Sequence, residues 1–366
     1  MTTQLLEGIR AIDMTEVWAG PMGTSFLGDL GADVVKVESF PRPPALSRPL
    51  AEGTTAPGDG PPYERAGAHH MANRNKRSIA VNIRTEAGGE ALDRLIASVD
   101  VFIEGYSAGT IENLGFGYER LRQLNPGLIM ISMPGWGVEG PYRGYATLGS
   151  GLDSTLGHAA IRGYPGGPAN EIPVMYHTDA TGAVALVFAV VTALRQREQT
   201  GEGCFIDLSQ AEAFAWQIPG LYAESTMNRR IPQRLGNVDP HVVPHGCYRT
   251  AGGLAGDEAW VTIAAENDQQ WAGVATAAGH PEWAASPHPW ATVVGRLRAR
   301  EAIDAALTTY AASGTAEELA DAIVEAGGLA ASVAPHVALL TSPQLAARDW
   351  LLTVDHRYAG TQTLAG

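Results

Sequence analysis

The first 132 residues alternate between short β-branched apolar runs and longer segments in which apolar positions recur at helical spacing. Such strands are typical of a parallel sheet that is covered on both faces. Repeated βαβ units therefore predict a Rossmann-like doubly wound α/β sheet, with ligand sites at the carboxyl ends of its strands. We expect strands at 9–14, 32–37, 78–82, 101–103 and 128–132, and helices at 22–30, 85–98 and 111–124.

The longest apolar run, from Ala183 to Leu194, predicts a buried helix. A basic turn and the glycines of Thr200-Gly-Glu-Gly203 follow it, which is how a helix commonly ends. The next residues, 204–208, predict a short strand, and Ser209 with Glu212 matches the capping-box pattern at the start of another helix.

The pattern changes after residue 213, and a chain of 366 residues should divide into about two domains. Strands at 246–250 and 260–263 predict a hairpin, and alanine-rich helices are expected at 268–279, 290–309 and 315–326. The predicted organisation is a large α/β domain at 1–213, a linker at 214–245, a small α+β domain at 246–330 and a segment at 331–366 that returns to the large domain.

Charge and cysteine content exclude several classes of protein. The formal net charge of −14 disfavours binding to nucleic acid or to an anionic membrane. No run of eighteen uncharged apolar residues and no basic-then-apolar leader is present, so we expect a cytoplasmic protein. Cys204 and Cys247 form neither a disulfide framework nor a zinc-site spacing, and no metal is predicted.

Asp179 is the strongest candidate for chemistry, because it precedes the long apolar helix among small residues that let a ligand approach. The helix dipole and the free N–H groups at that end favour the ionised carboxylate, which in a tight site is a credible nucleophile toward an acyl carbon. On spacing alone the structural role is favoured, in which Thr178 or Asp179 caps the helix and takes no part in catalysis.

A set of motifs occurs in fixed order along the chain. They are Leu6 to Asp13, Ala19-Gly-Pro21, Leu27 to Glu38, Asn75-Lys-Arg-Ser78, Leu114 to Tyr118, Asn125-Pro126, Gly135-Trp-Gly137 and Gly140-Pro-Tyr142, followed by Asp179, Gly182, Ala193-Leu194, Arg197, Thr200 to Gly203, Ile206 to Ser209 and Glu212-Ala213. This ordered set resembles the class III CoA-transferase family, which includes formyl-CoA transferase, carnitine CoA-transferase and α-methylacyl-CoA racemase. The resemblance extends from about residue 6 to about residue 355 by family-level analogy.

This resemblance implies that Asp179 is a covalent nucleophile, with acyl-CoA and a carboxylic acid as substrates and no permanently bound cofactor. It also implies two chains threaded through each other as an interlocked dimer. The implied CoA contacts are Trp18, Ala19, Lys36, Ser39, Asn73, Asn75, Lys76, Arg77, Tyr106 and Gly135, and the implied substrate-pocket residues are Trp136, Tyr142, His177, Gly252 and Gly253. For many of these the alternative is structural: a solvated basic turn, packed aromatic rings, a helix-cap histidine, and a hairpin tip at the two glycines.

Three departures from formyl-CoA transferase narrow the expected chemistry. Trp18 stands where that enzyme has a glutamine, Ser39 where it has an arginine, and Gly149 near its catalytic glutamate. These differences argue against formyl-CoA and oxalate and favour a bulkier acyl group. The histidine that the racemase branch uses in proton transfer is also missing, since Thr147-Leu148 occupies its place.

The predicted function is CoA transfer. The alternatives are an acyl-CoA isomerase or racemase that uses Asp179 as a base, and a CoA-binding subunit that completes the site of a related chain.

Overall fold

The computed structural model describes residues 4–38, 59–168 and 176–365, and its chain divides into two compact units. Each unit is described by itself. The first consists of residues 1–161, 169–232 and 355–360, and the second consists of residues 162–168, 233–354 and 361–366.

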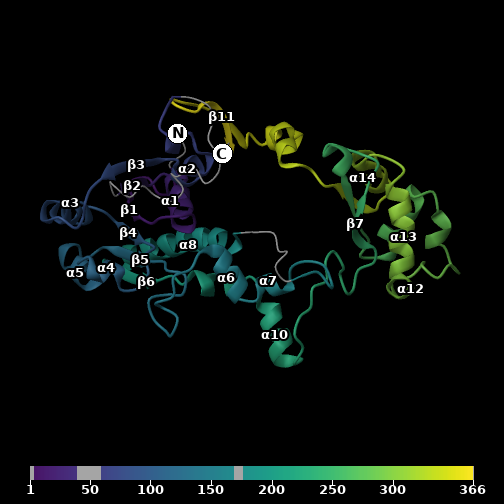
Figure 1. Ribbon diagram of the computed structural model, residues 1–366, viewed down its shortest axis with the longest axis horizontal. Coiled ribbons are helices and arrows are strands. Elements are labelled where there is room, and N and C mark those ends of the chain that lie inside the picture. Colours follow the sequence, from purple (N-terminus) through teal and green to yellow (C-terminus); the bar gives the residue numbers. More distant parts are fainter. Residues whose placement is uncertain (1–3, 39–58, 169–175, 366) are drawn as a thin grey trace. The chain divides into compact units, whose positions relative to one another are not determined.

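A six-stranded parallel sheet forms the centre of the first unit (Figure 1). All its neighbouring strands run parallel, so the predicted doubly wound sheet is confirmed. The order reverses between β1 and β4, and such a switch point is where open α/β sheets bind ligands. The spatial order is β3 (Lys76–Ala80), β2 (Asp33–Glu38), β1 (Arg10–Met14), β4 (Val101–Glu104), β5 (Ile129–Ser132) and β6 (Cys204–Asp207).

Helices cover both faces of this sheet, because alternate strand residues are apolar on each side. On one face α1 (Ala19–Asp29) and α8 (His177–Thr200) pack over Val101 and Ile129. On the other face α3 (Glu86–Ile96), α4 (Thr110–Asn113) and α5 (Tyr118–Leu124) pack over Phe102 and Met130. Shorter helices are η2 (Pro62–Arg65), α2 (Gly67–Asn73), α6 (Gly149–Thr155), α7 (His158–Ile161), α9 (Gln210–Ala215) and α10 (Pro219–Met227).

Helix α8 is twelve residues longer than the apolar run that predicted it, since it spans 24 residues rather than 183–194. By length and composition it is apolar enough to cross a membrane. Its apolar character has a packing cause, however. Leu186, Val190 and Ala193 belong to the core beneath the sheet, and a Cβ atom on Gly23 of α1 would lie 2.9 Å from the carbonyl oxygen of Ala183.

The second unit contains an antiparallel sheet of β7 (His245–Arg249), β8 (Trp260–Ala264) and β9 (Leu329–Ser332), so the predicted hairpin is confirmed and gains a third strand. The fully buried Trp271 lies in its core. The remaining elements are η3 (Gly256–Glu258), α11 (Asp268–Ala277), η4 (Pro281–Ala284), α12 (Val293–Arg298), α13 (Arg300–Ala311), α14 (Ala316–Glu325), η5 (His336–Thr341) and α15 (Pro343–Ala347). The paired strands β10 (Leu351–His356) and β11 (Gly360–Ala365) follow, and the turn that joins them belongs with residues 355–360 to the first unit.

Two expectations about helices were wrong. The helix predicted at 111–124 is two helices, because Gly115 between them has φ +87°, a left-handed conformation that interrupts a helix. The helix predicted at 290–309 likewise divides into α12 and α13. The predicted linker contains α10, which begins at Pro219, where the missing N–H of proline costs no helical hydrogen bond.

A buried carboxylate, Asp13 near the end of β1, joins the elements around the switch point. Its Oδ2 lies 3.0 Å from Nζ of Lys76 on β3 and 3.5 Å from Nζ of Lys36 on β2, and it accepts a 2.8 Å hydrogen bond from Thr24 of α1. The other oxygen accepts hydrogen bonds from N–H and Oγ1 of Thr15. Burial by itself raises the pKa of Asp13, but the two lysines and Thr15 outweigh it and hold the pKa well below its ordinary range.

We expect Asp13→Asn to destabilise the first unit by about 3–5 kcal/mol, because it leaves two buried ammonium groups without their carboxylate. The change should appear as a lower midpoint in urea denaturation. Asp33→Asn is the control, since Asp33 pairs with the exposed Arg77 and should change the midpoint much less. Equal midpoints for the two variants would contradict this account of Asp13.

Candidate active site

A cavity of about 90 Å³ lies at the switch point of the sheet. The segments that follow β1, β4 and β5 line it, so the cavity lies at the carboxyl ends of the strands, where a ligand site is expected. Asp179 from α8 and the first residues of α1 complete the lining. The lining residues are Thr15 to Gly20, Gly105 to Ser107, Met133 to Trp136, Arg143, Tyr145, Thr147 to Gly149, Leu152, Asp179 and Gln210.

Asp179 is the third residue of α8 and is only 6 % exposed. Its carboxylate accepts a hydrogen bond from the N–H of Ala19, the first residue of α1. A Cβ atom on Gly149 would overlap its Oδ2, so the absence of a side chain at 149 gives the carboxylate its space. The nucleophile candidate is therefore held between the beginnings of three helices, α1, α6 and α8.

Asp179 does not cap its own helix. The N-cap residue of α8 is Tyr176, which makes no side-chain capping bond. The buried Asp153 of α6 instead accepts the N–H of Thr178 at 3.3 Å, and the Thr178 hydroxyl donates to the carbonyl oxygen of Gly149 at 2.8 Å. The structural alternative for Asp179 is thus disfavoured, because Asp153 satisfies this helix end and leaves the Asp179 carboxylate facing the cavity.

Burial raises the pKa of Asp179 to about 6. The N–H of Ala19 opposes this shift and the nearby charge of Asp153 adds to it. The sequence predicts that the helix end favours the ionised form of Asp179. The loss of solvation on burial has the larger effect on its pKa, so the net shift favours the protonated form. A carboxylate with this pKa is still mainly ionised at pH 7, and it is more basic than an ordinary aspartate, which suits either a nucleophile or a base.

The turn into α1 is strained beside the cavity. Val17 has φ +69°, a left-handed conformation that a β-branched residue rarely adopts. It leads to Trp18, whose ring lies 4.5 Å from the ring of Tyr176 and whose Nε1 donates to Sδ of Met22. The indole of Trp18 therefore packs between the starts of α1 and α8 while it also lines the cavity.

An aromatic loop covers another part of the cavity lining. The ring of Tyr142 lies 5.3 Å from that of Trp136 and 5.1 Å from that of Tyr145. The backbone N–H of Val138 donates to both carboxylate oxygens of Asp207 at 3.0 Å, which ties the loop to the end of β6. Trp136 lines the cavity as predicted, whereas Tyr142 supports the loop from outside it.

The predicted CoA-binding residues fall into two groups. Trp18, Ala19, Tyr106 and Gly135 line the cavity with Asp179. The others lie elsewhere, and their CoA contacts remain predictions; Ser39 is outside the described residues. Lys36 and Lys76 are buried against Asp13, and burial lowers the pKa of Lys76 to about 8. The side chain of Asn75 binds Asp29, and that of Arg77 binds Asp33. The Asn73 side chain donates to the carbonyl oxygen of His69.

Gly252 and Gly253 belong to the second unit, where they form a tethered loop rather than a free hairpin tip. The carbonyl oxygen of Gly252 accepts the N–H of Ala316 at 2.9 Å, and the next residue, Leu254, donates its N–H to the carboxylate of Glu317 at 3.2 Å. A Cβ atom on Gly253 would crowd the same carboxylate. Their role at the active site remains a prediction.

Sequence reasoning missed several residues around the nucleophile. Glu16, Arg143 and Gln210 line the cavity, and Asp153 caps α8. The signal for Asp153 is an acid inside an otherwise small-residue helix, and that for Arg143 is a lone cation in a glycine-bounded turn. Glu104, at the end of β4, was also missed; burial raises its pKa to about 7.

Two groups of histidine and carboxylate side chains lie in the first unit, each with ligand atoms within 4.8 Å of one another. In one group His177 Nδ1 lies 3.7 Å from Asp153, and the rings of His177 and His158 meet edge to face. His177 therefore supports the capping residue and does not line the cavity itself.

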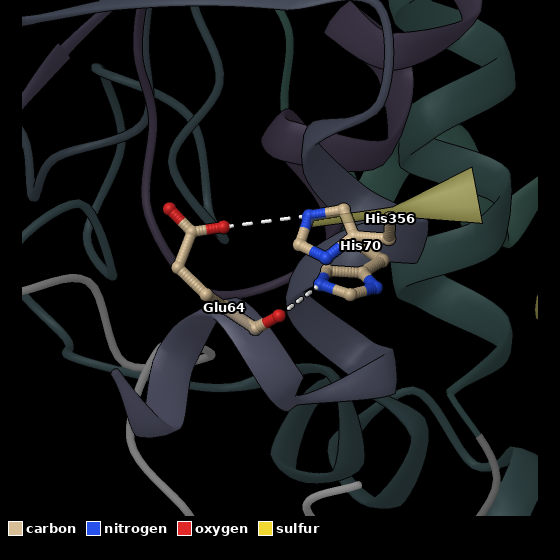
Figure 2. Close-up of side chains that lie close together, drawn as sticks. All are labelled: Glu64, His70 and His356. Carbon is tan, nitrogen blue, oxygen red and sulfur yellow. Dashed lines mark hydrogen bonds and ion pairs between the residues drawn. The ribbon is translucent and has the colours of Figure 1, made fainter. Parts of the chain in front are cut away.

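The other group comprises Glu64, His70 and His356, with the two imidazole rings 4.4 Å apart (Figure 2). The Nδ1 atom of His356 accepts backbone N–H groups from Tyr358 and Ala359, so a neutral ring carries its proton on Nε2. That Nε2 faces the Glu64 carboxylate at 3.5 Å as a donor. The Nε2 atom of His70 donates to the backbone oxygen of Glu64 at 2.8 Å. Both imidazole nitrogens that face Glu64 are thus donors, which fits contacts among these three side chains better than a metal centre.

Comparison with known proteins agrees with this geometry. The model of CoA-transferase family III matches residues 6–365. The chain is 31 % identical to succinyl-CoA–D-citramalate CoA-transferase of Chloroflexus aurantiacus, over 95 % of this chain and 83 % of that one. It is 35 % identical to the beta subunit of succinyl-CoA–L-malate CoA-transferase of the same organism, over 78 % and 67 % of the two chains.

A crystal structure of a CaiB/BaiF family protein from Brucella suis superimposes with a TM-score of 0.84 at 29 % identity, and the match covers 97 % of this chain and 90 % of that one. The family model thus spans nearly the whole sequence, the solved structure shares the fold, and the relatives named above are CoA-transferases. On this evidence the chain belongs to CoA-transferase family III.

Proposed function

We propose that this enzyme moves CoA between an acyl-CoA thioester and a free carboxylic acid, with Asp179 as the covalent nucleophile. The observation that carries the proposal is the position of Asp179. Its carboxylate is buried at the switch point, faces the cavity and is not used as a helix cap. The names of the related transferases support the same reaction class.

The reaction follows from the chemistry of a carboxylate and a thioester. An oxygen of Asp179 attacks the acyl carbonyl, the C–S bond breaks, and CoA leaves as a thiolate, which leaves a mixed anhydride of Asp179 and the donor acid. The thiolate attacks the carbonyl carbon of Asp179, which forms an aspartyl-CoA thioester and releases the donor acid. The acceptor carboxylate then repeats these steps in reverse. Each exchange conserves the thioester, so no separate energy source is needed.

Oxyanions formed in these steps need hydrogen-bond donors that are already in place. The first N–H groups of a helix have no intrahelical acceptor. Ala19 and Gly20, at the start of α1, line the cavity beside Asp179 and are our candidates for this role. The glycine loop at 252–253 of a second chain is another candidate, because the family resemblance implies an active site that two chains share.

We propose that CoA is a substrate rather than a resident cofactor. We also propose a cytoplasmic location.

Asp179→Ala should abolish the covalent intermediate and lower CoA transfer by at least about 10³-fold, because the nucleophile is removed. Intact-mass spectrometry after incubation with an acyl-CoA panel, with hydroxylamine as a trap, measures the adduct. Asp93→Asn, which changes a surface carboxylate on α3 paired with Arg120, is the control and should keep both adduct and activity. A CoA adduct that persists in Asp179→Ala would exclude Asp179 as the nucleophile.

Adduct formation should rise with pH and reach half its maximum near pH 6. The reason is that burial raises the pKa of Asp179 to about 6, and only the ionised form attacks. Rapid-quench measurements between pH 4.5 and 8 test this profile. Asp153→Asn removes a neighbouring negative charge and should move the midpoint to lower pH. A wild-type midpoint near 4 would refute a raised pKa.

We further propose that two copies of the chain assemble as the interlocked dimer that the family resemblance implies. An exposed apolar surface on α8 supports assembly of some kind. Phe188 is 73 % exposed and Val184 is 62 % exposed, and a groove of about 1140 Å³ runs along the helix to Trp216. Exposed apolar surface of this kind commonly marks an interaction site. The related beta subunit leaves a heteromer with a similar chain as the alternative.

After unfolding and refolding, Phe188→Asp should yield monomer where wild type yields dimer, because threaded chains assemble only while they fold and the new charge opposes that assembly at this apolar surface. Light scattering coupled to size exclusion measures the mass directly. Leu124→Asp, at an exposed apolar residue of α5, is the control and should remain dimeric. A wild-type monomer would favour the heteromer, and a dimer that survives Phe188→Asp would place the interface elsewhere.

An acyl-CoA isomerase or racemase remains the second candidate, since a carboxylate with pKa about 6 also suits proton abstraction. No histidine lines the described cavity to serve as a partner base. Entry of solvent deuterium at the α-carbon of an acyl-CoA, without adduct formation, would favour this candidate over transfer.

A further inference from the structure

The cavity beside Asp179 has an uneven distribution of charge. Two carboxylates, Glu16 and Asp179, contribute to its lining, and Arg143 is the only cationic side chain among the described lining residues. Lys36 and Lys76 do not compensate, because they are buried against Asp13 and do not line the cavity. An anionic group that enters the cavity therefore meets two repulsive charges and one attractive charge.

Arg143 is available to a ligand. Two other arginines of the first unit, Arg120 and Arg197, are held by the carboxylates of Asp93 and Asp100. The guanidinium of Arg143 makes neither an ion pair nor a side-chain hydrogen bond with any residue in the described ranges. A planar guanidinium of this kind is suited to bind a carboxylate through two parallel hydrogen bonds.

The backbone around Arg143 is fixed even though the side chain is exposed. Its N–H bonds to the carbonyl oxygen of Gly140, and that of Tyr145 bonds to the carbonyl oxygen of Tyr142. The aromatic rings on either side pack together, and Asp207 holds the loop at Val138. Arg143 is thus presented to the cavity by an ordered turn, so that little backbone entropy is lost when a ligand binds.

We propose that Arg143 binds the second carboxylate of a dicarboxylic substrate, as the acceptor acid or as the acyl group of the CoA donor. The first carboxyl group of that substrate would react at Asp179. This inference rests on the proposed transferase function and names its substrate class. The two related enzymes support it, since succinyl, citramalate and malate groups all carry a second carboxylate. The cavity of about 90 Å³ suits a short acid, because a single water molecule needs about 10–15 Å³ and the cavity therefore has room for several water-sized groups.

The test compares succinate with butyrate, two four-carbon acids that differ only in the terminal carboxylate. We expect wild type to prefer succinate as acceptor, and Arg143→Gln to lower kcat/KM for succinate by about 10–100-fold while changing that for butyrate less than about 3-fold. Arg143→Lys should recover part of the preference for succinate, because lysine restores the positive charge but not the two parallel N–H donors of the guanidinium. Arg94→Gln, at an exposed arginine on α3, is the matched control and should behave as wild type.

Calorimetric titration of succinate and butyrate into the same four proteins separates this inference from the function on which it rests. If no acyl-CoA gives an adduct, the proposed function fails. Succinate binding that Arg143→Gln abolishes and Arg94→Gln retains would then still support the carboxylate site. An equal loss with both acids in Arg143→Gln, or succinate behaviour indistinguishable from that of Arg94→Gln, overturns the inference.

Discussion

The active site depends on one buried charge cluster, in which Asp13 holds Lys36 and Lys76. These three side chains come from adjacent strands, and Thr24 attaches α1 to the same carboxylate. Lys76 also donates to the carbonyl oxygen of Pro21, in the first turn of α1. The cluster therefore fixes the height of α1 above the sheet. That height decides where the N–H of Ala19 points, and this N–H binds the nucleophile.

The nucleophile itself illustrates a balance between solvation and local donors. A helix N-terminus stabilises a carboxylate, and Asp179 receives such help from α1. The loss of water around a residue that is only 6 % exposed costs more, so the net effect favours the proton. The result is a group that is ionised at neutral pH but poorly solvated, and poor solvation makes an oxygen nucleophile more reactive toward a neutral thioester.

Local sequence patterns predicted the central sheet, since strands such as β4 and β5 are continuous apolar runs with one interpretation. The position of Asp179 at the start of a buried helix followed from the same reasoning. The cavity lining beyond it did not. Arg143 and Asp153 stand out only weakly in the sequence, and their roles depend on how separate segments meet at the switch point. Conversely, Lys36 and Lys76 resemble ligand-binding cations in sequence, whereas tertiary packing directs both toward Asp13.

Gly149 has an evolutionary consequence. The Asp179 carboxylate occupies the volume that a Cβ atom at 149 would need, so the glycine and the present placement of the aspartate are compatible only with each other. A single change at 149 collides with the nucleophile, and a different placement of the aspartate leaves a void above the glycine. The two positions are therefore epistatic. A variant that carries any larger residue at 149 would have to reposition Asp179 at the same time, so neither position can change alone.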